Sequence, residues 1–156
     1  MAMKTLEYLR GISTEDCRKL RSRGIRHTNQ LLHATELEID RERLGTKTGI
    51  SPGRLLEFAN QSAMLEISGM ERYLPIVRRL GIESLKDLKR VEPPELHSRV
   101  VDAVGLAGAP SLSMVEYWIG QARTIDTVEE PGGVPPAQQE SPALLRTPPA
   151  AARRVG

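Results

Sequence analysis

The sequence is poor in aromatic residues and in cysteine, and both shortages limit what the chain can be. Aromatic side chains make up 3% of the 156 residues. A core built instead from Leu, Ile, Val, Ala and Met favours packed helices over a sheet. Cys17 is the sole cysteine; this excludes an internal disulfide and a cysteine-based zinc site, and it fits a reducing cytoplasmic setting. We expect neither a membrane span, which needs about 20 apolar residues in a row, nor a secretory signal.

The charge balance is close to neutral and no catalytic pattern is present. The 22 basic residues exceed the 20 acidic ones by two, which neither requires nor excludes a polyanionic partner. The three histidines show no metal-ligand spacing. No paired carboxylates, Ser/His/Asp arrangement or phosphate-binding loop can be found. We therefore expect no enzymatic activity, no metal and no cofactor.

Residues 9–25 have the pattern of a helix, a tight turn and a second helix that stops at a glycine. Gly11 suits a short turn because it lacks Cβ and can adopt a positive φ. Ser13 with Asp16 three residues later predicts a capping box at the start of the second helix. Gly24 then predicts a left-handed helix end. Together these features predict a helix–hairpin–helix unit.

The same landmarks recur along the chain and predict an internal duplication. Gly11, Gly24 and Gly49 correspond to Gly69, Gly81 and Gly105, at offsets of 58, 57 and 56 residues. A second hairpin is expected at 48–51, where Ser51 as N-cap and Pro52 as first residue favour a helix start. We predict an all-α fold of two tandem halves, each with paired hairpins, over residues 1–64 and 65–126.

Apolar spacing predicts which residues are buried. Leu37, Ile39 and Leu44 are expected on one buried face. Phe58 and Trp118 take equivalent places in the two halves and are expected to anchor their cores. Cys17, one helical turn from Leu20, is expected to be a small core residue. Pro75 indicates either a late helix start near residue 73 or a kinked helix.

The composition changes near residue 127. Residues 127–156 hold six of the eleven prolines and two consecutive glycines. Such a stretch has too little apolar surface to form a packed core. We expect it to be a disordered, Pro-rich C-terminal tail.

The ordered hairpins resemble a bacterial family described only as a domain of unknown function, number 4332. The resemblance covers about residues 5–124. It is carried by Gly11-Ile12 with Gly24-Ile25, Thr48-Gly49-Ile50-Ser51, Ile67-Ser68-Gly69-Met70 and Trp118-Ile119. It implies tandem helix–hairpin–helix repeats and brings no established activity. Modules of that type often bind DNA without sequence preference, and some serve only for protein interaction.

The candidate binding residues lie in the first two hairpins. In a DNA-binding hairpin, the turn presents backbone N–H groups at a helix N-terminus to a phosphate. Basic residues are densest around the first hairpin, and the second has a base on either side. The alternative is a solvated helix face whose cations favour the C-terminal end of the helix dipole. The predicted nucleic-acid-binding residues are Arg10, Gly11, Ile12, Ser13, Arg18, Lys19, Arg21, Lys47, Gly49, Ile50, Ser51 and Arg54.

Two functions are compatible with these patterns. One is a non-catalytic module that binds duplex DNA through backbone phosphates, without sequence preference. The other is a protein-interaction adaptor without affinity for nucleic acid. The near-neutral charge and the serines standing where a second hairpin glycine is usual favour the adaptor, whereas the local basic cluster favours DNA. The sequence does not define an oligomeric state.

Overall fold

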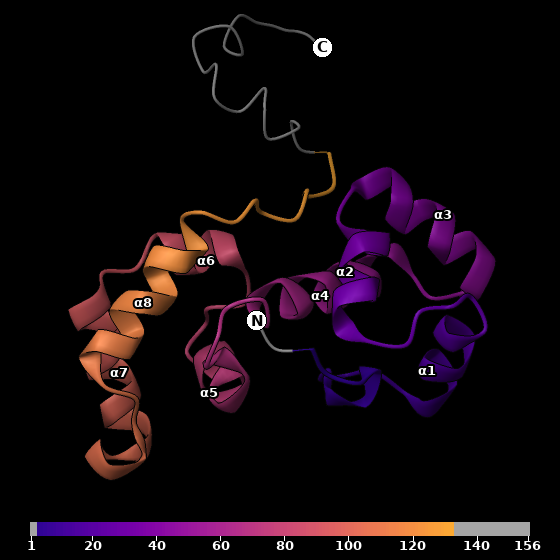
Figure 1. Cartoon of the computed structure of the whole chain (residues 1–156). Coiled ribbons are helices and arrows are strands. Elements are labelled where there is room, and N and C mark those ends of the chain that lie inside the picture. Colours follow the sequence, from indigo (N-terminus) through magenta and orange to yellow (C-terminus); the bar gives the residue numbers. More distant parts are fainter. Residues whose placement is uncertain (1–2, 133–156) are drawn as a thin grey trace, which may run out of the picture.

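The computed structural model describes residues 3–132, and this part of the chain is helical, as predicted, with no strand beyond an isolated bridge between Thr5 and His27 (Figure 1). The first half contains η1 (Leu6–Tyr8), α1 (Thr14–Arg21), α2 (Thr28–Thr35), α3 (Glu38–Thr48) and α4 (Pro52–Met64). The second contains η2 (Met70–Arg72), α5 (Leu74–Arg79), α6 (Leu85–Lys89), α7 (Pro93–Val104), η3 (Leu106–Gly108) and α8 (Leu112–Ala122). No helix among residues 3–132 has the length and apolar character needed to cross a bilayer.

Local geometry repeats at the paired positions of the two halves. All six paired glycines have positive φ, between 78° and 91°. At the end of α1, Ile25 N–H donates to Leu20 O at 3.0 Å, and at the end of α5, Ile82 N–H donates to Val77 O at 3.3 Å. Each of these hydrogen bonds closes a turn of six residues and satisfies a carbonyl that the helix end leaves without an intrahelical partner. The repeated closures support the inferred duplication.

Helix α4 connects the two halves. It packs against α2 and α3 and also contacts α6. In Figure 1 it lies between the other helices of the first half and those of the second half. Met64, Leu65 and Ile67, at and beyond its C-terminus, are completely buried. One continuous apolar cluster therefore includes residues from both halves.

Phe58 and Trp118 are core residues, as predicted. Phe58 is 1% exposed in α4, and Trp118 is fully buried in α8. The Trp118 ring lies 5.4 Å from the Tyr73 ring, centroid to centroid, in a tilted arrangement. Such aromatic contacts add to the stabilisation from burial alone.

The predicted buried face of α3 is wrong at two of its three positions. Leu37 and Ile39 are exposed, and only Leu44 is buried. The helix begins at Glu38, so Leu37 lies outside it. The face that packs inward contains Arg41, Leu44, Gly45 and Thr48, which are spaced three and four residues apart as one helical face requires.

Two short elements explain the remaining local differences. The chain before the first hairpin forms only the three-residue 3-10 helix η1, because Leu9 is already extended with φ −73° and ψ 136°. Pro75 lies at the second position of α5, where the missing N–H costs no helical hydrogen bond. The late-start interpretation of Pro75 is therefore the right one.

The beginning of the stretch assigned to the disordered tail is ordered. Val128 is 6% exposed, and Glu129 N–H donates to Glu36 O at 2.9 Å. Arg41, 1% exposed, donates to Thr35 O at 2.8 Å and to Glu129 O. Carbonyls left open at the end of α2, those of Thr35 and Glu36, provide two of these acceptors, and Glu129 provides the third. Composition cannot reveal such contacts. Residues 133–156, the rest of the predicted tail, lie outside the described residues.

Candidate nucleic-acid interface

The first hairpin caps its own helix. Asp16 N–H donates to Ser13 Oγ, and Ser13 N–H donates to Asp16 Oδ2, both at 3.0 Å. This is the predicted capping box. It also places a carboxylate at the N-terminus of α1, where a phosphate would have to approach. The backbone of this hairpin is therefore a poor phosphate site.

Arg54 joins the second hairpin to the first. Its guanidinium donates to both carboxylate oxygens of Asp16, through Nη1 at 3.2 Å and through Nη2, and to Gly11 O at 3.0 Å. Burial alone raises the pKa of Asp16, but the bonds from Arg54 and Ser13 outweigh it and hold that pKa below its ordinary value. Arg54 is thus a structural clamp, with its charge already engaged.

Arg18 and Arg21 form exposed ion pairs. Arg18 pairs with Glu15 one turn earlier in α1, and Arg21 pairs with Glu7 at 2.7 Å. The hydrogen bond from each arginine lowers the pKa of its glutamate. Because exposed pairs of this kind contribute little to stability, an incoming anion can compete for these arginines.

The second hairpin lacks the carboxylate that caps the first. Gly49 has φ 78°, and its N–H donates to Gly45 O at 2.8 Å. Ser51 caps α4 by accepting from Arg54 N–H at 3.2 Å, and the first turn of α4 contains no acidic residue. A Cβ on Gly49 would lie 3.6 Å from Lys19 Nζ. A cation from α1 therefore lies beside this turn.

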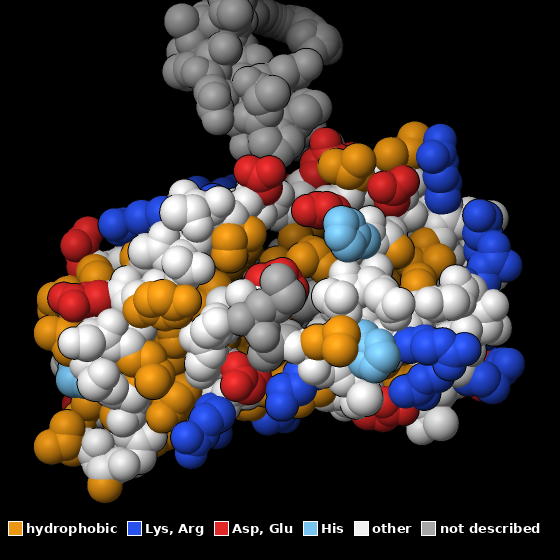
Figure 2. All heavy atoms as spheres, viewed as in Figure 1, with side chains coloured by type: hydrophobic (Ala, Val, Ile, Leu, Met, Phe, Trp, Pro, Cys, Tyr) orange, Lys and Arg blue, Asp and Glu red, His pale blue; other side chains and the backbone are white. Residues whose placement is uncertain are grey.

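Packing of α1 and α3 collects further cations next to the second hairpin. We call Lys19, Arg23, Arg43 and Lys47 the α1–α3 basic face. Arg23, Arg43 and Lys47 line a hollow of about 460 Å³ together with Ile25, His33, Ala34, Asp40 and Leu44. Figure 2 shows Lys and Arg side chains gathered on the side of the molecule formed by α1 and α3.

Most charges of the basic face have no carboxylate partner. Among the described residues, Lys19, Arg23 and Lys47 form no ion pair, and Arg43 only approaches Asp40 at 4.0 Å. Arg23, Arg43 and Lys47 are exposed, and Lys19 is half-buried. Unpaired exposed cations in one cluster produce a positive surface potential that attracts anions.

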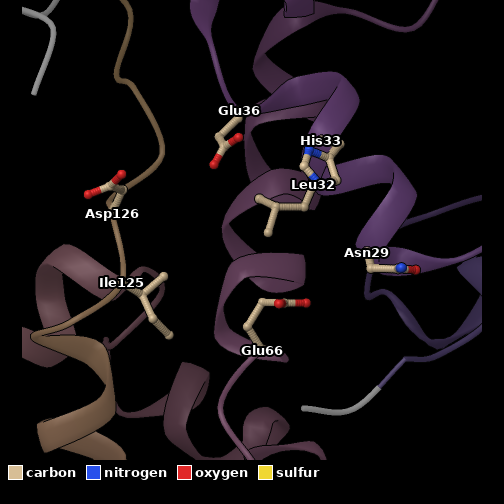
Figure 3. A pocket seen from close by; sticks show the side chains of 7 residues that line it. All are labelled: Asn29, Leu32, His33, Glu36, Glu66, Ile125 and Asp126. Atoms are coloured by element: carbon tan, nitrogen blue, oxygen red, sulfur yellow. The ribbon is translucent and has the colours of Figure 1, made fainter.

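An acidic hollow borders the basic face. Its volume is about 360 Å³, and its lining consists of Asn29, Leu32, His33, Glu36, Glu66, Ile125 and Asp126 (Figure 3). His33 lines both hollows. Its three carboxylates repel a polyanion, so the favourable surface ends at α2.

The structure brings some of the predicted site residues together and separates others. Lys19, Lys47 and the Gly49 turn form one surface, whereas Arg10 lies apart, beside Arg78 and Arg79. The Ile50 side chain is 2% exposed and belongs to the core. Ile12 is half-buried and packs against the same core. The Ile50 N–H is also engaged, because it donates to Thr48 Oγ1 at 3.2 Å in a buried hydrogen bond, so Ile50 offers a ligand neither its side chain nor its amide.

Arg23 and Arg43 of the basic face were absent from the predicted set. Asp40, Arg43 and Lys47 follow one another at helical spacing on α3, which places them on one face. That spacing could have indicated Arg43. Arg23 becomes part of the face only through the packing of α1 on α3, and a single sequence contains no signal for this contact.

Cys17 is buried and the described residues contain no metal cluster. The Cys17 side chain is 1% exposed, and burial raises the pKa of its thiol, so the prediction of a core residue is confirmed. Within residues 3–132, no three His, Cys, Asp or Glu side chains are grouped for metal binding.

A family model described as "Domain of unknown function (DUF4332)" matches residues 10–125. The chain belongs to this family. Searches of the curated proteins and of the solved structures found no match. The matched residues include helices α1 to α8. The description of the family names no activity.

Proposed function

We propose that this DUF4332 protein binds duplex DNA without sequence preference, through its phosphates, at the α1–α3 basic face and the adjoining second hairpin. The observation that carries the proposal is the clustering of Lys19, Arg23 and Lys47 without carboxylate partners. Unpaired cations can neutralise phosphates and release the counterions that surround a duplex. The chain is proposed to be a binding module and not an enzyme.

We centre the proposed interface on the second hairpin and not on the first. Asp16 occupies the N-terminus of α1, and Arg54 is engaged by Asp16. The first turn of α4 contains no acidic residue, and helix N-termini favour anions through their partial positive charge. Lys19 and Lys47 flank this turn from α1 and α3.

The test is fluorescence anisotropy of a labelled duplex titrated with the full chain over a salt series. We expect a Kd of about 1–100 μM at moderate salt, as is usual for non-specific binding, and equal affinity for unrelated sequences. The variant K19Q/R23Q/K47Q removes three phosphate contacts. The slope of log K against log salt concentration should therefore become about 2–3 less negative.

A matched control removes the same charge elsewhere. Lys89, Arg90 and Arg123 form no ion pair among the described residues and lie in or after second-half helices. The variant K89Q/R90Q/R123Q should retain the salt slope. An equal loss in both triple variants would contradict a localised interface, and absence of binding at low salt would exclude DNA as the partner.

A protein-interaction adaptor is the second candidate, and one observation favours it. Leu112, Met114 and Tyr117 on α8 are 38%, 37% and 47% exposed, and Leu106 nearby in the chain is 75% exposed. Figure 2 shows apolar side chains on the side occupied by α7 and α8. Clustered exposed apolar groups often mark interaction sites. Capture of a partner that is lost with M114K/Y117K and kept with K19Q/R23Q/K47Q would support this function.

A further inference from the structure

A second basic hollow lies apart from the α1–α3 basic face, between the first hairpin and α5. Its volume is about 330 Å³, and its lining consists of Arg10, Pro75, Arg78, Arg79 and Glu83. Three arginines and one glutamate are thus among its lining residues. None of the three arginines forms an ion pair in the described structure. In Figure 2, Lys and Arg side chains also lie in the region of α5.

One donor of an arginine that lines this hollow has no acceptor within the described structure. Arg78 is half-buried, and its Nε–H is shielded from solvent without a hydrogen-bond partner. A buried, charged donor without a partner is costly, and such a group commonly indicates a bound ion or water. The donor belongs to one of the three arginines that line the hollow, so the Arg78 guanidinium has hydrogen-bonding capacity that the protein itself does not use.

Local structure holds the backbone at each of these arginines. Arg10 N–H donates to Gln61 Oε1 at 2.9 Å, and Gln61 Nε2 donates to Arg10 O at 3.1 Å. Gln61 is 1% exposed, so the backbone of Arg10 is held by a buried amide. Arg78 and Arg79 are in the last turn of α5. The hollow is therefore built from fixed backbone on both sides.

We propose that this hollow is a binding site for a phosphate group, supplied by a phosphomonoester or by inorganic phosphate. A carboxylate has two oxygens, and one arginine fork satisfies them. Three arginines approaching from two segments match the greater number of oxygens and the double negative charge of phosphate. Glu83 opposes the anion and limits its affinity. This site is independent of DNA binding by the α1–α3 basic face.

Isothermal titration calorimetry with inorganic phosphate and the full chain tests the proposal. We expect a Kd in the millimolar range or below. R78Q and R79Q should each weaken binding about tenfold, because each removes charge-assisted hydrogen bonds. R90Q, an exposed arginine outside the hollow, is the matched control and should bind as the wild type does.

Glu83→Gln provides a test with the opposite sign. Removing the one carboxylate of the hollow should strengthen phosphate binding several-fold, a result that a purely structural role of Glu83 would not produce. Dimethyl phosphate, a singly charged diester, should bind more weakly than inorganic phosphate, and acetate more weakly still. The assignment would be overturned if R78Q bound phosphate with the same heat and affinity as the wild type, or if the wild type bound acetate as tightly as phosphate.

Discussion

The clamp between Arg54 and Asp16 should stabilise the first half, and Arg54→Met should remove it. The Asp16 side chain is 7% exposed and the Arg54 side chain is 43% exposed. The guanidinium carbon of Arg54 lies over the Phe58 ring, 5.4 Å from its centroid. Methionine retains much of the apolar stem, so the substitution removes the charge, the hydrogen bonds and this cation–π contact while keeping the stem.

The expected loss follows from the bonds removed. Hydrogen bonds to charged groups contribute about 1.5–3 kcal/mol each, but water replaces part of this at the exposed Arg54. Asp16 also keeps its bonds with Ser13. We expect the free energy of unfolding to fall by about 2 kcal/mol, which for a chain of this size lowers Tm by about 4–8 °C.

The loss should depend on pH with a defined sign. The folded-state pKa of Asp16 is lowered, so its ionised form contributes stability above the unfolded-state pKa. That contribution disappears as the pH falls through the folded-state value. The difference between wild type and R54M should therefore be full at pH 7 and shrink steadily below about pH 4.

Urea denaturation followed by far-UV circular dichroism and by the fluorescence of Trp118, the single tryptophan, measures this difference. R18M is the matched control, because Arg18 pairs with Glu15 on the exposed surface of the same helix, and its midpoint should remain unchanged. A stability of R54M equal to that of the wild type at pH 7, or a deficit that persists undiminished in acid, would refute the role assigned to the clamp.

Three further outcomes test the fold. In the same urea titration, Gly24→Ala should lower the free energy of unfolding by about 1 kcal/mol, because Gly24 has φ 83°. Gly53→Ala is the contrast: the space around its Cβ position is open, so the free energy of unfolding should stay unchanged or rise by about 0.5 kcal/mol. A chain ending at residue 126 should lose about 2 kcal/mol relative to one ending at 132, because the burial of Val128 and the acceptor for Arg41 are lost. Cys17 should react with a thiol reagent much more slowly in the folded chain than in urea, and equal rates would contradict its burial.

The elements that were predicted correctly are encoded by local patterns. Ser13 with Asp16, and Ser51 with Pro52, mark helix starts in the sequence, and the structure has caps at both places. Such caps depend on residues within one turn of each other. Gly24 similarly marks a helix end because few other residues tolerate its φ. Propensity and spacing are sufficient for features of this range.

Contacts between distant segments were beyond the reach of a single sequence. Arg54 has the pattern of a phosphate ligand beside the second hairpin, yet its partners Asp16 and Gly11 lie about forty residues away. Arg41 has the pattern of a surface cation on a charged helix, yet carbonyl oxygens from α2 and from Glu129 surround it. An arginine can be buried where backbone acceptors converge, and only the assembled topology brings those acceptors together.

A comparison of the paired positions in the two halves indicates that most cations of the α1–α3 basic face are not a requirement of the fold. At the offsets that pair the glycines of the two halves, Lys19 corresponds to Ile76, Arg23 to Leu80 and Lys47 to Ala103, whereas Arg43 corresponds to Arg99. Ile76 and Leu80 pack partly against the core, and the second half forms its helices without these cations. Clustered like charges repel one another and offer a folded domain no stability of their own. Three of the four cations of this face, Lys19, Arg23 and Lys47, are therefore absent at the paired positions of the second half. This agrees better with a surface used for binding a polyanion than with a solvated helix face common to both halves.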